Sequence, residues 1–196
     1  MPLFGVVLYF QLQSTHTMML HPELKNTIYL IVIIPFTIVF PGISLLLLYR
    51  SKAISSLHIR KQEERLLPYI VFLLYYGMAY YLLNQFKSYM PPSFFSFLLA
   101  GIVAVATGFV LNFFIKVSVH AIAFFNVTGA LIACSQILPM ATKTESIITN
   151  SSLLILGGLV AWSRLQLNAH KPKEIWLGIF IGLATGYFVV ANGIYL

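Results

Sequence analysis

Charged residues are scarce in this chain of 196 residues, of which only 9% are Asp, Glu, Lys or Arg. In an average soluble domain about a quarter of the residues are charged. Hydrophobic residues make up 59% of the chain, and the mean hydropathy is +0.88. A soluble fold of this size has too little interior to bury so many apolar side chains. The composition therefore excludes a soluble enzyme and a disordered chain, and it indicates an integral membrane protein.

Aspartate is absent, so the five acidic residues are all glutamates, and they stand against twelve Lys and Arg. The resulting net charge of +7 is typical of loops that face an anionic leaflet. Nucleic acid is excluded as a partner because there is no soluble basic domain to carry it. The single cysteine, Cys134, lies in an apolar run, which excludes a disulfide framework and a multi-cysteine metal site. We predict no metal site.

Six apolar segments approach the length of about 20 residues that a membrane-spanning helix needs. They cover residues 28–49, 67–86, 94–115, 119–138, 147–162 and 175–196, and the fifth is the shortest. The sequence therefore predicts an all-α fold, a polytopic six-helix transmembrane bundle over residues 28–196. Residues 1–27 are predicted to form an N-terminal interfacial segment, and a re-entrant helix is the alternative for their apolar first part.

Most of the cations fall at one end of the predicted bundle. The loops 50–66, 116–118 and 163–174 share that end, and they hold nine of the twelve Lys and Arg. This bias taken alone favours a cytoplasmic position for that end.

The loop between the fifth and sixth spans places His170 and Glu174 four residues apart. If a helix begins near His170, the two side chains share one face, and the carboxylate would orient the imidazole. Pro172 fits the first turn of such a helix, where a missing N–H costs nothing. The alternative is a solvated loop with a weak His–Glu pair.

The junction between the third and fourth spans carries Lys116, Ser118 and His120. Lys116 alone is explained by a side chain that reaches the membrane interface. At the start of a helix, however, Ser118 and His120 add a hydroxyl, backbone donors and a ring that carries a proton. These are suitable parts for an anion site.

The sixth span also carries Gly178, Gly182 and Gly186 at four-residue spacing. Small residues on one face allow helices to approach closely within a membrane. We interpret this stripe as structural.

Together the two polar segments resemble the type-2 phosphatidic-acid phosphatase superfamily of membrane lipid phosphatases. That superfamily carries Ser-Gly-His at the start of its fourth helix. Between its fifth and sixth helices it carries Ser-Arg, five residues, His, three residues and Asp. The matching residues here are Ser118-Val119-His120 and Ser163-Arg164, followed by His170 and Glu174 at the same spacing. The resemblance covers about residues 28–196 and implies the same six-helix fold.

The resemblance implies hydrolysis of a lipid phosphomonoester or diphosphate, for example phosphatidic acid, phosphatidylglycerophosphate or a polyprenyl diphosphate, without a cofactor. His170 would attack phosphorus, Glu174 would orient the ring, and His120 would protonate the leaving oxygen. The phosphate would be held by Arg164, Ser118 and Lys116. The expected partners are membrane lipids and a lipid phosphate substrate, and the expected location is the bacterial inner (cytoplasmic) membrane. The resemblance also implies that the site faces outward, against the charge bias.

The superfamily's first motif, Lys, six residues, Arg-Pro, is missing before Ser118. Arg60 and Arg65 lie in the first loop at the same end, where they supply replacement cations or form an ordinary solvated charge run. Val119 stands in place of the motif glycine, and Glu174 in place of the aspartate.

These departures leave two alternatives to the enzyme. The first is a catalytically inactive relative that binds a lipid headgroup, or that serves as a structural subunit beside a membrane-protein partner. The second is a haem b protein with His120 and His170 as its two axial ligands.

Overall fold

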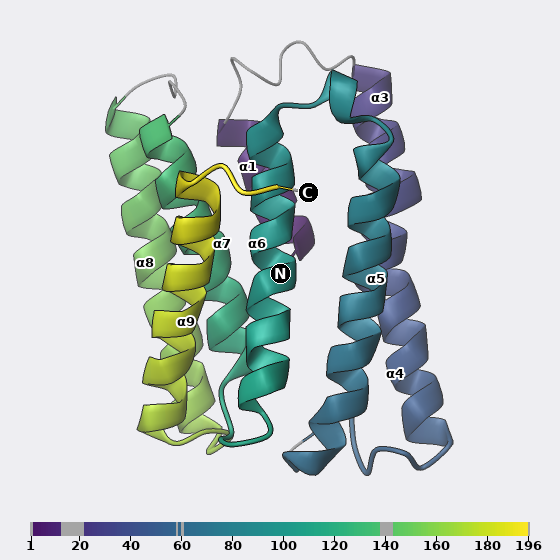
Figure 1. The fold of residues 1–196 in the computed structure, drawn as a ribbon. Helices are drawn as coiled ribbons and strands as arrows, with labels where there is room; N and C mark the ends of the chain where they lie inside the picture. Colours follow the sequence, from purple (N-terminus) through teal and green to yellow (C-terminus); the bar gives the residue numbers. More distant parts are fainter. Residues whose placement is uncertain (1, 13–21, 58, 60, 138–142, 196) are drawn as a thin grey trace.

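The structure is a computed structural model that describes residues 2–12, 22–57, 59, 61–137 and 143–195. Every regular element within these residues is helical. Six of the helices are long and apolar enough to span a membrane. The all-α fold with six spans is therefore confirmed, and the chain is an integral membrane protein. Figure 1 shows the long helices standing side by side, with their connecting loops at the two ends of the bundle.

The first span, Ile28–Arg50, is a composite helix. It follows α3 (Pro22–Thr27) and consists of the π-helical segments η1 (Ile28–Ile33) and η2 (Pro35–Val39) and then α4 (Phe40–Arg50). Pro35 lacks a backbone N–H, and its ring disfavours ordinary α-helical bonding in the preceding turn, which explains the irregular bonding there. The second span consists of η3 (Glu63–Arg65) and α5 (Leu66–Asn84), and it lies beside α4 on one flank of the bundle (Figure 1).

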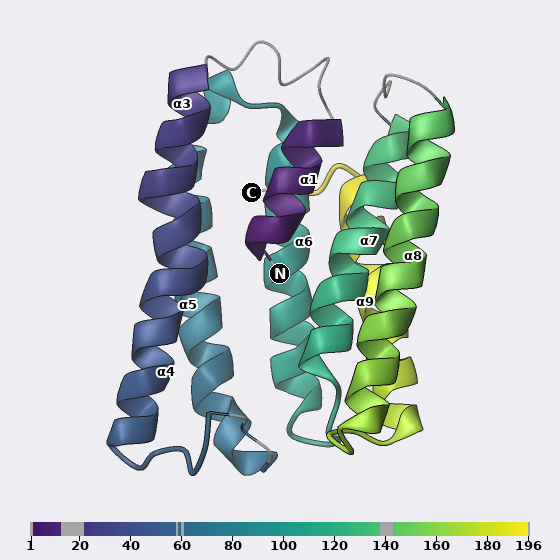
Figure 2. The ribbon, with the colours of Figure 1, turned by 180° about the vertical axis from the view of Figure 1, so that it is seen from behind.

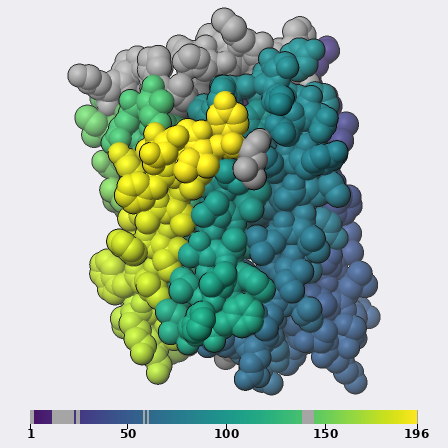
Figure 3. Space-filling view, in the orientation of Figure 1, coloured from purple at the N-terminus to yellow at the C-terminus, as the bar shows by residue number. Residues whose placement is uncertain are grey.

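The remaining spans form the other flank. After the short turn η4 (Lys87–Tyr89), they are α6 (Pro92–Leu111), α7 (Val119–Ile137), α8 (Lys143–Gln166) and α9 (Pro172–Ala191). Much of the space between the ribbons of α5 and α6 in Figure 1 is occupied by side chains in the space-filling view of Figure 3. The two flanks therefore pack into one bundle.

The fifth span is longer than the sequence predicts, because α8 extends well beyond residues 147–162 at both ends. Hydroxyl and amide side chains lower the hydropathy of its first half, but they find partners without breaking the helix. Ser152 Oγ donates to the carbonyl of Ile148 at 2.7 Å, and Asn150 Nδ2 donates to Ser135 Oγ of α7 at 3.2 Å. A polar residue whose bonds are satisfied along the helix is tolerated within a span.

The N-terminal helix α1 (Pro2–Leu12) is packed against the long helices of the bundle. Its Val6 and Tyr9 are fully buried, and the Tyr9 hydroxyl lies 2.7 Å from Ser93 Oγ at the start of α6. Figure 2 shows α1 beside α6 and α7. With 11 residues it is too short to cross a membrane. Its interfacial or re-entrant position stays a prediction. Residues 13–21 lie outside the described part of the chain.

The closest helix packing joins α7 to α9 through the glycine stripe, which confirms its structural role. A Cβ atom added at Gly178 would lie 3.0 Å from the carbonyl oxygen of Ser118. At Gly182 it would lie 2.5 Å from the carbonyl oxygen of Ile122, and at Gly186 it would collide with that of Asn126. The backbones of the two helices are therefore in direct contact, as small residues permit in membrane proteins.

Asn126 joins a third helix to this pair. Its side chain is buried, and Nδ2 donates to the carbonyl of Ala100 on α6 at 3.1 Å and to Thr185 Oγ1 on α9 at 3.1 Å. An amide that is satisfied from two helices fixes their relative depth, because any sliding would break its bonds in an apolar interior.

Gly182→Ala is expected to destabilise the protein, because the new methyl group would meet backbone atoms that cannot move aside cheaply. The loss in unfolding free energy should be about 1–3 kcal/mol. The matched control is Gly158→Ala on α8, where an added Cβ has no neighbour within 4 Å. This control should be neutral or should gain up to about 1 kcal/mol from helix propensity. Thermal unfolding of the detergent-solubilised variants measures both, and equal stability of the two variants would contradict the direct backbone contact.

Candidate functional site

The polar loops named from the sequence meet at one end of the bundle. The loop after α4, the junction between α6 and α7, and the loop between α8 and α9 all lie at the lower end in Figure 1. Because the spans alternate in direction, this end collects the segments that contain Arg65, Lys116 and His170. The common end predicted for these residues is therefore observed.

The loop before α9 is shaped by the way α8 ends. Asn168 adopts a left-handed conformation with φ of +49°, which asparagine tolerates better than most residues. The amide of Asn168 donates to the carbonyl of Leu165 at 2.9 Å, and that of Ala169 donates to the carbonyl of Arg164 at 3.2 Å. This pair of bonds is a Schellman motif, which satisfies the last carbonyls of α8 and turns the chain back toward the bundle.

His170 lies just before α9, two residues earlier than the helix start, and Pro172 occupies the first turn as predicted. His170 Nδ1 lies 2.7 Å from Glu174 Oε2, and the two side chains are only 5% and 13% exposed. Residues 166–168 and 171–173 of the loop are exposed, but the His170–Glu174 pair itself is shielded from solvent. An ionised carboxylate can only accept a hydrogen bond, so the neutral ring carries its proton on Nδ1 and donates it to Glu174, which leaves the lone pair on Nε2.

Burial lowers the pKa of His170 below its ordinary value, although the hydrogen bond to Glu174 opposes this effect. The positive charges of Arg65 and Lys116 lower this pKa further. The ring is therefore neutral at pH 7, and it is close enough to both cations to interact with them electrostatically.

Ser118 connects the start of α7 to α9. It is fully buried, and its backbone N–H donates to the carbonyl of Glu174 at 3.2 Å. Its Oγ accepts the backbone N–H of Ala121 at 3.4 Å, so the side chain caps α7. Because Oγ is the acceptor in that bond, the hydroxyl proton is left to donate elsewhere.

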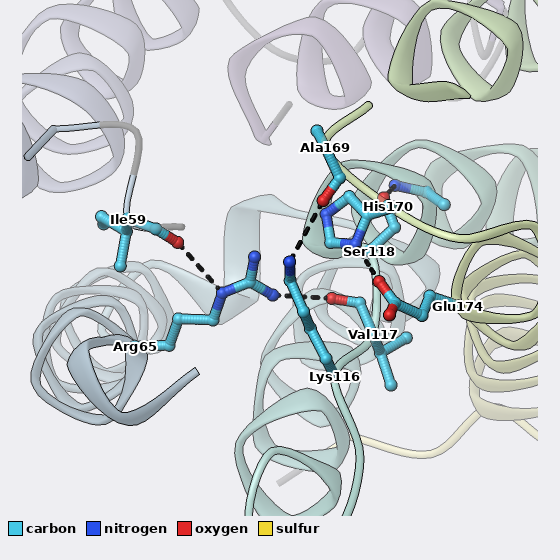
Figure 4. A network of polar contacts seen from close by, with 9 residues as sticks. Ile59, Arg65, Lys116, Val117, Ser118, Ala169, His170 and Glu174 are labelled. Atoms are coloured by element: carbon cyan, nitrogen blue, oxygen red, sulfur yellow. Dashed lines mark hydrogen bonds and ion pairs between the residues drawn. The ribbon is translucent and has the colours of Figure 1, made fainter. Parts of the chain in front are cut away.

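Lys116 does more than reach the membrane interface. Its Nζ donates to the carbonyl of Ala169 at 3.2 Å, and the side chain is half-buried. This bond ties the junction between α6 and α7 to the residue that precedes His170, as Figure 4 shows.

The charged stretch of the first loop divides into an inner and an outer part. Arg65 is only 8% exposed, and its Nη1 donates to the carbonyl of Val117 at 2.9 Å while Nε donates to that of Ile59 at 3.2 Å. Lys61, by contrast, is 67% exposed and pairs with Glu64 at 3.4 Å. Arg60 lies outside the described residues. Figure 4 shows Arg65 and Lys116 on one side of the His170 ring and Glu174 on the other.

His120 and Arg164 complete the group of site residues. His120 is exposed in the first turn of α7, within electrostatic range of Arg164, His170 and Arg65. Arg164 Nε is buried and has no hydrogen-bond partner within the described part of the chain. A buried guanidinium donor without a partner is costly, and an anionic ligand would satisfy it.

An amide pair that the sequence analysis missed holds the first loop in place. Gln62 Nε2 donates to the carbonyl of Asn112 at 2.7 Å, and Asn112 Nδ2 donates to the carbonyl of Gln62 at 3.0 Å. The pair fixes the segment before Arg65 against the end of α6. No local sequence pattern signals a contact between two amides 50 residues apart.

The arrangement provides a neutral imidazole with a free nitrogen, surrounded by cations, where the spans reach the membrane surface. Such a group can bind an anion and can carry out nucleophilic chemistry on it. Among the described residues, no group of three or more His, Cys, Asp or Glu side chains could hold a metal ion.

Comparisons with protein-family models, with curated proteins and with solved structures find no match to this chain. The fold defines the class, a polytopic α-helical membrane protein with six spans.

Arg65→Met should cost about 1–3 kcal/mol of unfolding free energy, because the variant leaves the buried carbonyl of Val117 and the partly buried carbonyl of Ile59 without their donor. Arg50→Met is the matched control, since Arg50 is exposed at the end of α4. Chemical unfolding in mixed micelles compares the two, and an equal effect would show that Arg65 does not hold the first loop against the junction.

Proposed function

We propose that this protein is a lipid-phosphate phosphatase, resembling the type-2 phosphatidic-acid phosphatase superfamily, in a bacterial inner membrane. Its substrate would be a phosphomonoester or diphosphate of a lipid. The observation that carries the proposal is the buried His170–Glu174 pair, 2.7 Å apart, facing Arg65 and Lys116. The end of the spans is also where the phosphates of membrane lipids lie.

In the first step of the proposed reaction, His170 Nε2 attacks phosphorus and forms a P–N bond. In the substrate complex, the negative charge of the bound phosphate favours the imidazolium form of His120. The bond between phosphorus and the lipid oxygen breaks, and that oxygen takes a proton from this imidazolium. Glu174 stays hydrogen-bonded to Nδ1–H of His170, and its negative charge offsets the positive charge that the ring acquires. The products of this step are the dephosphorylated lipid and a phosphohistidine.

In the second step, water attacks the phosphohistidine. His120, now neutral, accepts a proton from this water, the P–N bond breaks, and inorganic phosphate leaves. The electron pair of the broken bond returns to Nε2, so His170 is neutral again and His120 is again protonated. The proton balance is closed over the two steps.

Three cations are available to hold the phosphate oxygens. Arg164 offers the unpaired Nε, and Arg65 still has donors beyond its two bonds to carbonyl groups. Lys116 uses one of its three N–H groups on Ala169. In this proposal Arg65 and Lys116 take over the work of the missing first motif. Positioning and charge neutralisation provide most of the catalysis in phosphoryl transfer.

A lipid-headgroup-binding protein without turnover is the second candidate. Lys116 and Arg65 already bond to backbone carbonyls, and the hydroxyl of Ser118 caps α7. These contacts favour a rigid binding site, in which the same cations would hold a phosphate that never reacts.

We expect the purified protein to release phosphate from phosphatidic acid, phosphatidylglycerophosphate or undecaprenyl diphosphate when EDTA is present. His170→Ala should reduce this release by at least about 1,000-fold, because the nucleophile is lost. Gln166→Ala, at the exposed end of α8, is the control and should retain full activity.

If the unaltered protein releases phosphate no faster than His170→Ala does, the proposed enzymatic activity is excluded. Saturable binding of phosphatidic acid in nanodiscs, together with no release from any substrate, would favour the headgroup-binding candidate instead.

The pH dependence of kcat/KM tests the role of the imidazole. Protonation of His170 removes the attacking lone pair, so activity should fall on the acidic side. Because the pKa of His170 is lowered, this fall should begin below the ordinary histidine value of about 6.5. Glu174→Gln removes the hydrogen bond that raises this pKa, and it should therefore move the acid limb to still lower pH while reducing the maximal rate.

Titration of the substrate phosphate, whose second pKa is near 6, would give an acid limb that is the same in both proteins. An unmoved limb in Glu174→Gln would therefore contradict the assignment of that limb to His170.

A further inference from the structure

A shallow apolar groove lies between α7 and α8 and is closed on one side by α1. Its lining residues are Phe4 of α1, Phe124 of α7, and Leu156, Leu159, Val160 and Ser163 of α8. Figure 2 shows these three helices from the side on which they lie together. All of the lining side chains are apolar except Ser163, which lies at the end of the groove nearest the loop before α9.

The groove leads away from the candidate site. Ser163 is followed directly by Arg164, the residue with the unpaired Nε. Phe124 stands one helical turn, about 6 Å, beyond His120 on α7. The polar end of the groove is therefore formed by the neighbours of two residues that the proposed reaction uses.

The groove also opens toward the membrane. Leu156 and Leu159 are exposed, and α8 forms one of the two least buried spans. From Leu156 to Ser163 the helix rises about 10 Å, which is about a third of the hydrocarbon thickness of a bilayer. A lipid can therefore enter sideways, with its headgroup at the end of the bundle and one chain along α8.

We propose that this groove holds the part of one hydrocarbon chain nearest the headgroup of the lipid whose phosphate binds beside His170. This inference rests on the proposed function and adds where one chain of the lipid substrate lies. The groove is no more apolar than the interior of the bilayer, so a lipid chain gains no hydrophobic free energy by entering it. The chain is therefore held by shape and packing. The phosphate and the chain are then bound together, which places phosphorus at the nucleophile.

Filling the groove should impair long-chain substrates alone. Leu156→Trp places a larger side chain in the groove, and Leu154→Trp is the matched control. Both leucines are on α8 with similar exposure, 45% for Leu156 and 47% for Leu154, but Leu154 does not line the groove. We expect Leu156→Trp to reduce kcat/KM for dioleoyl phosphatidic acid about tenfold or more relative to the control. The rate with p-nitrophenyl phosphate should be the same in the two variants.

Equal losses with dioleoyl phosphatidic acid in the two variants, or an equal loss with p-nitrophenyl phosphate in Leu156→Trp, would overturn the groove assignment. Leu156→Ala, which widens the groove without adding bulk, should retain activity on the long-chain lipid. If Leu156→Ala is active and Leu156→Trp is not, the added bulk in the groove causes the loss, and the loss of the leucine side chain does not.

A second measurement does not require turnover. Phosphatidic acid with a diazirine near the start of one chain should, on illumination, label peptides that contain residues 156–163, and Leu156→Trp should reduce this labelling. Similar labelling of every lipid-facing span would mean ordinary membrane lipid and would overturn the inference. If the groove is labelled selectively but the protein releases no phosphate, the result supports the lipid-chain site and contradicts the proposed phosphatase activity.

Discussion

The contact between the backbones of α7 and α9 is the constraint on which the rest of the structure depends. Gly178, Gly182 and Gly186 remove the side chains that would keep the two helices apart. Within a membrane, helices gain little from burying apolar surface, so close packing and the few interhelical hydrogen bonds decide their positions. The bonds of Asn126 to Ala100 and Thr185 fix α6 against the same pair. The site is therefore built on the helix pair whose backbones are in direct contact.

This contact also places the chemistry. Because α7 and α9 touch near their first turns, the backbone of Ser118 reaches the carbonyl of Glu174 at 3.2 Å. His120 follows on α7, and the Glu174 side chain holds His170. Arg65 then reaches across from the other flank to the carbonyl of Val117. Ser118, Arg65 and Lys116 each bond to backbone atoms of another segment, which holds these residues in place at the edge of an apolar bundle.

The sequence predicts the parts of the molecule that depend on local pattern. The six apolar runs predicted the six spans, and the four-residue spacing of His170 and Glu174 predicted their contact. The extent of α8 was underestimated because satisfied hydroxyl and amide side chains lower hydropathy without ending a helix. The burial of Arg65 could not be predicted, since Arg65 and Lys61 look alike in the sequence and only contacts with Val117 and Ile59 separate them. The functional role of every site residue stays a prediction.

The central claim is that His170 carries a phosphoryl group, and trapping this intermediate tests it most directly. Protein mixed with phosphatidic acid labelled with ³²P in the phosphate, and quenched in alkali within milliseconds, should hold label that is stable in base and released by acid. Mass spectrometry should place this label on His170, and His170→Ala should hold none. Phosphate release without any labelled histidine, or label on a residue other than His170, would contradict the proposed mechanism.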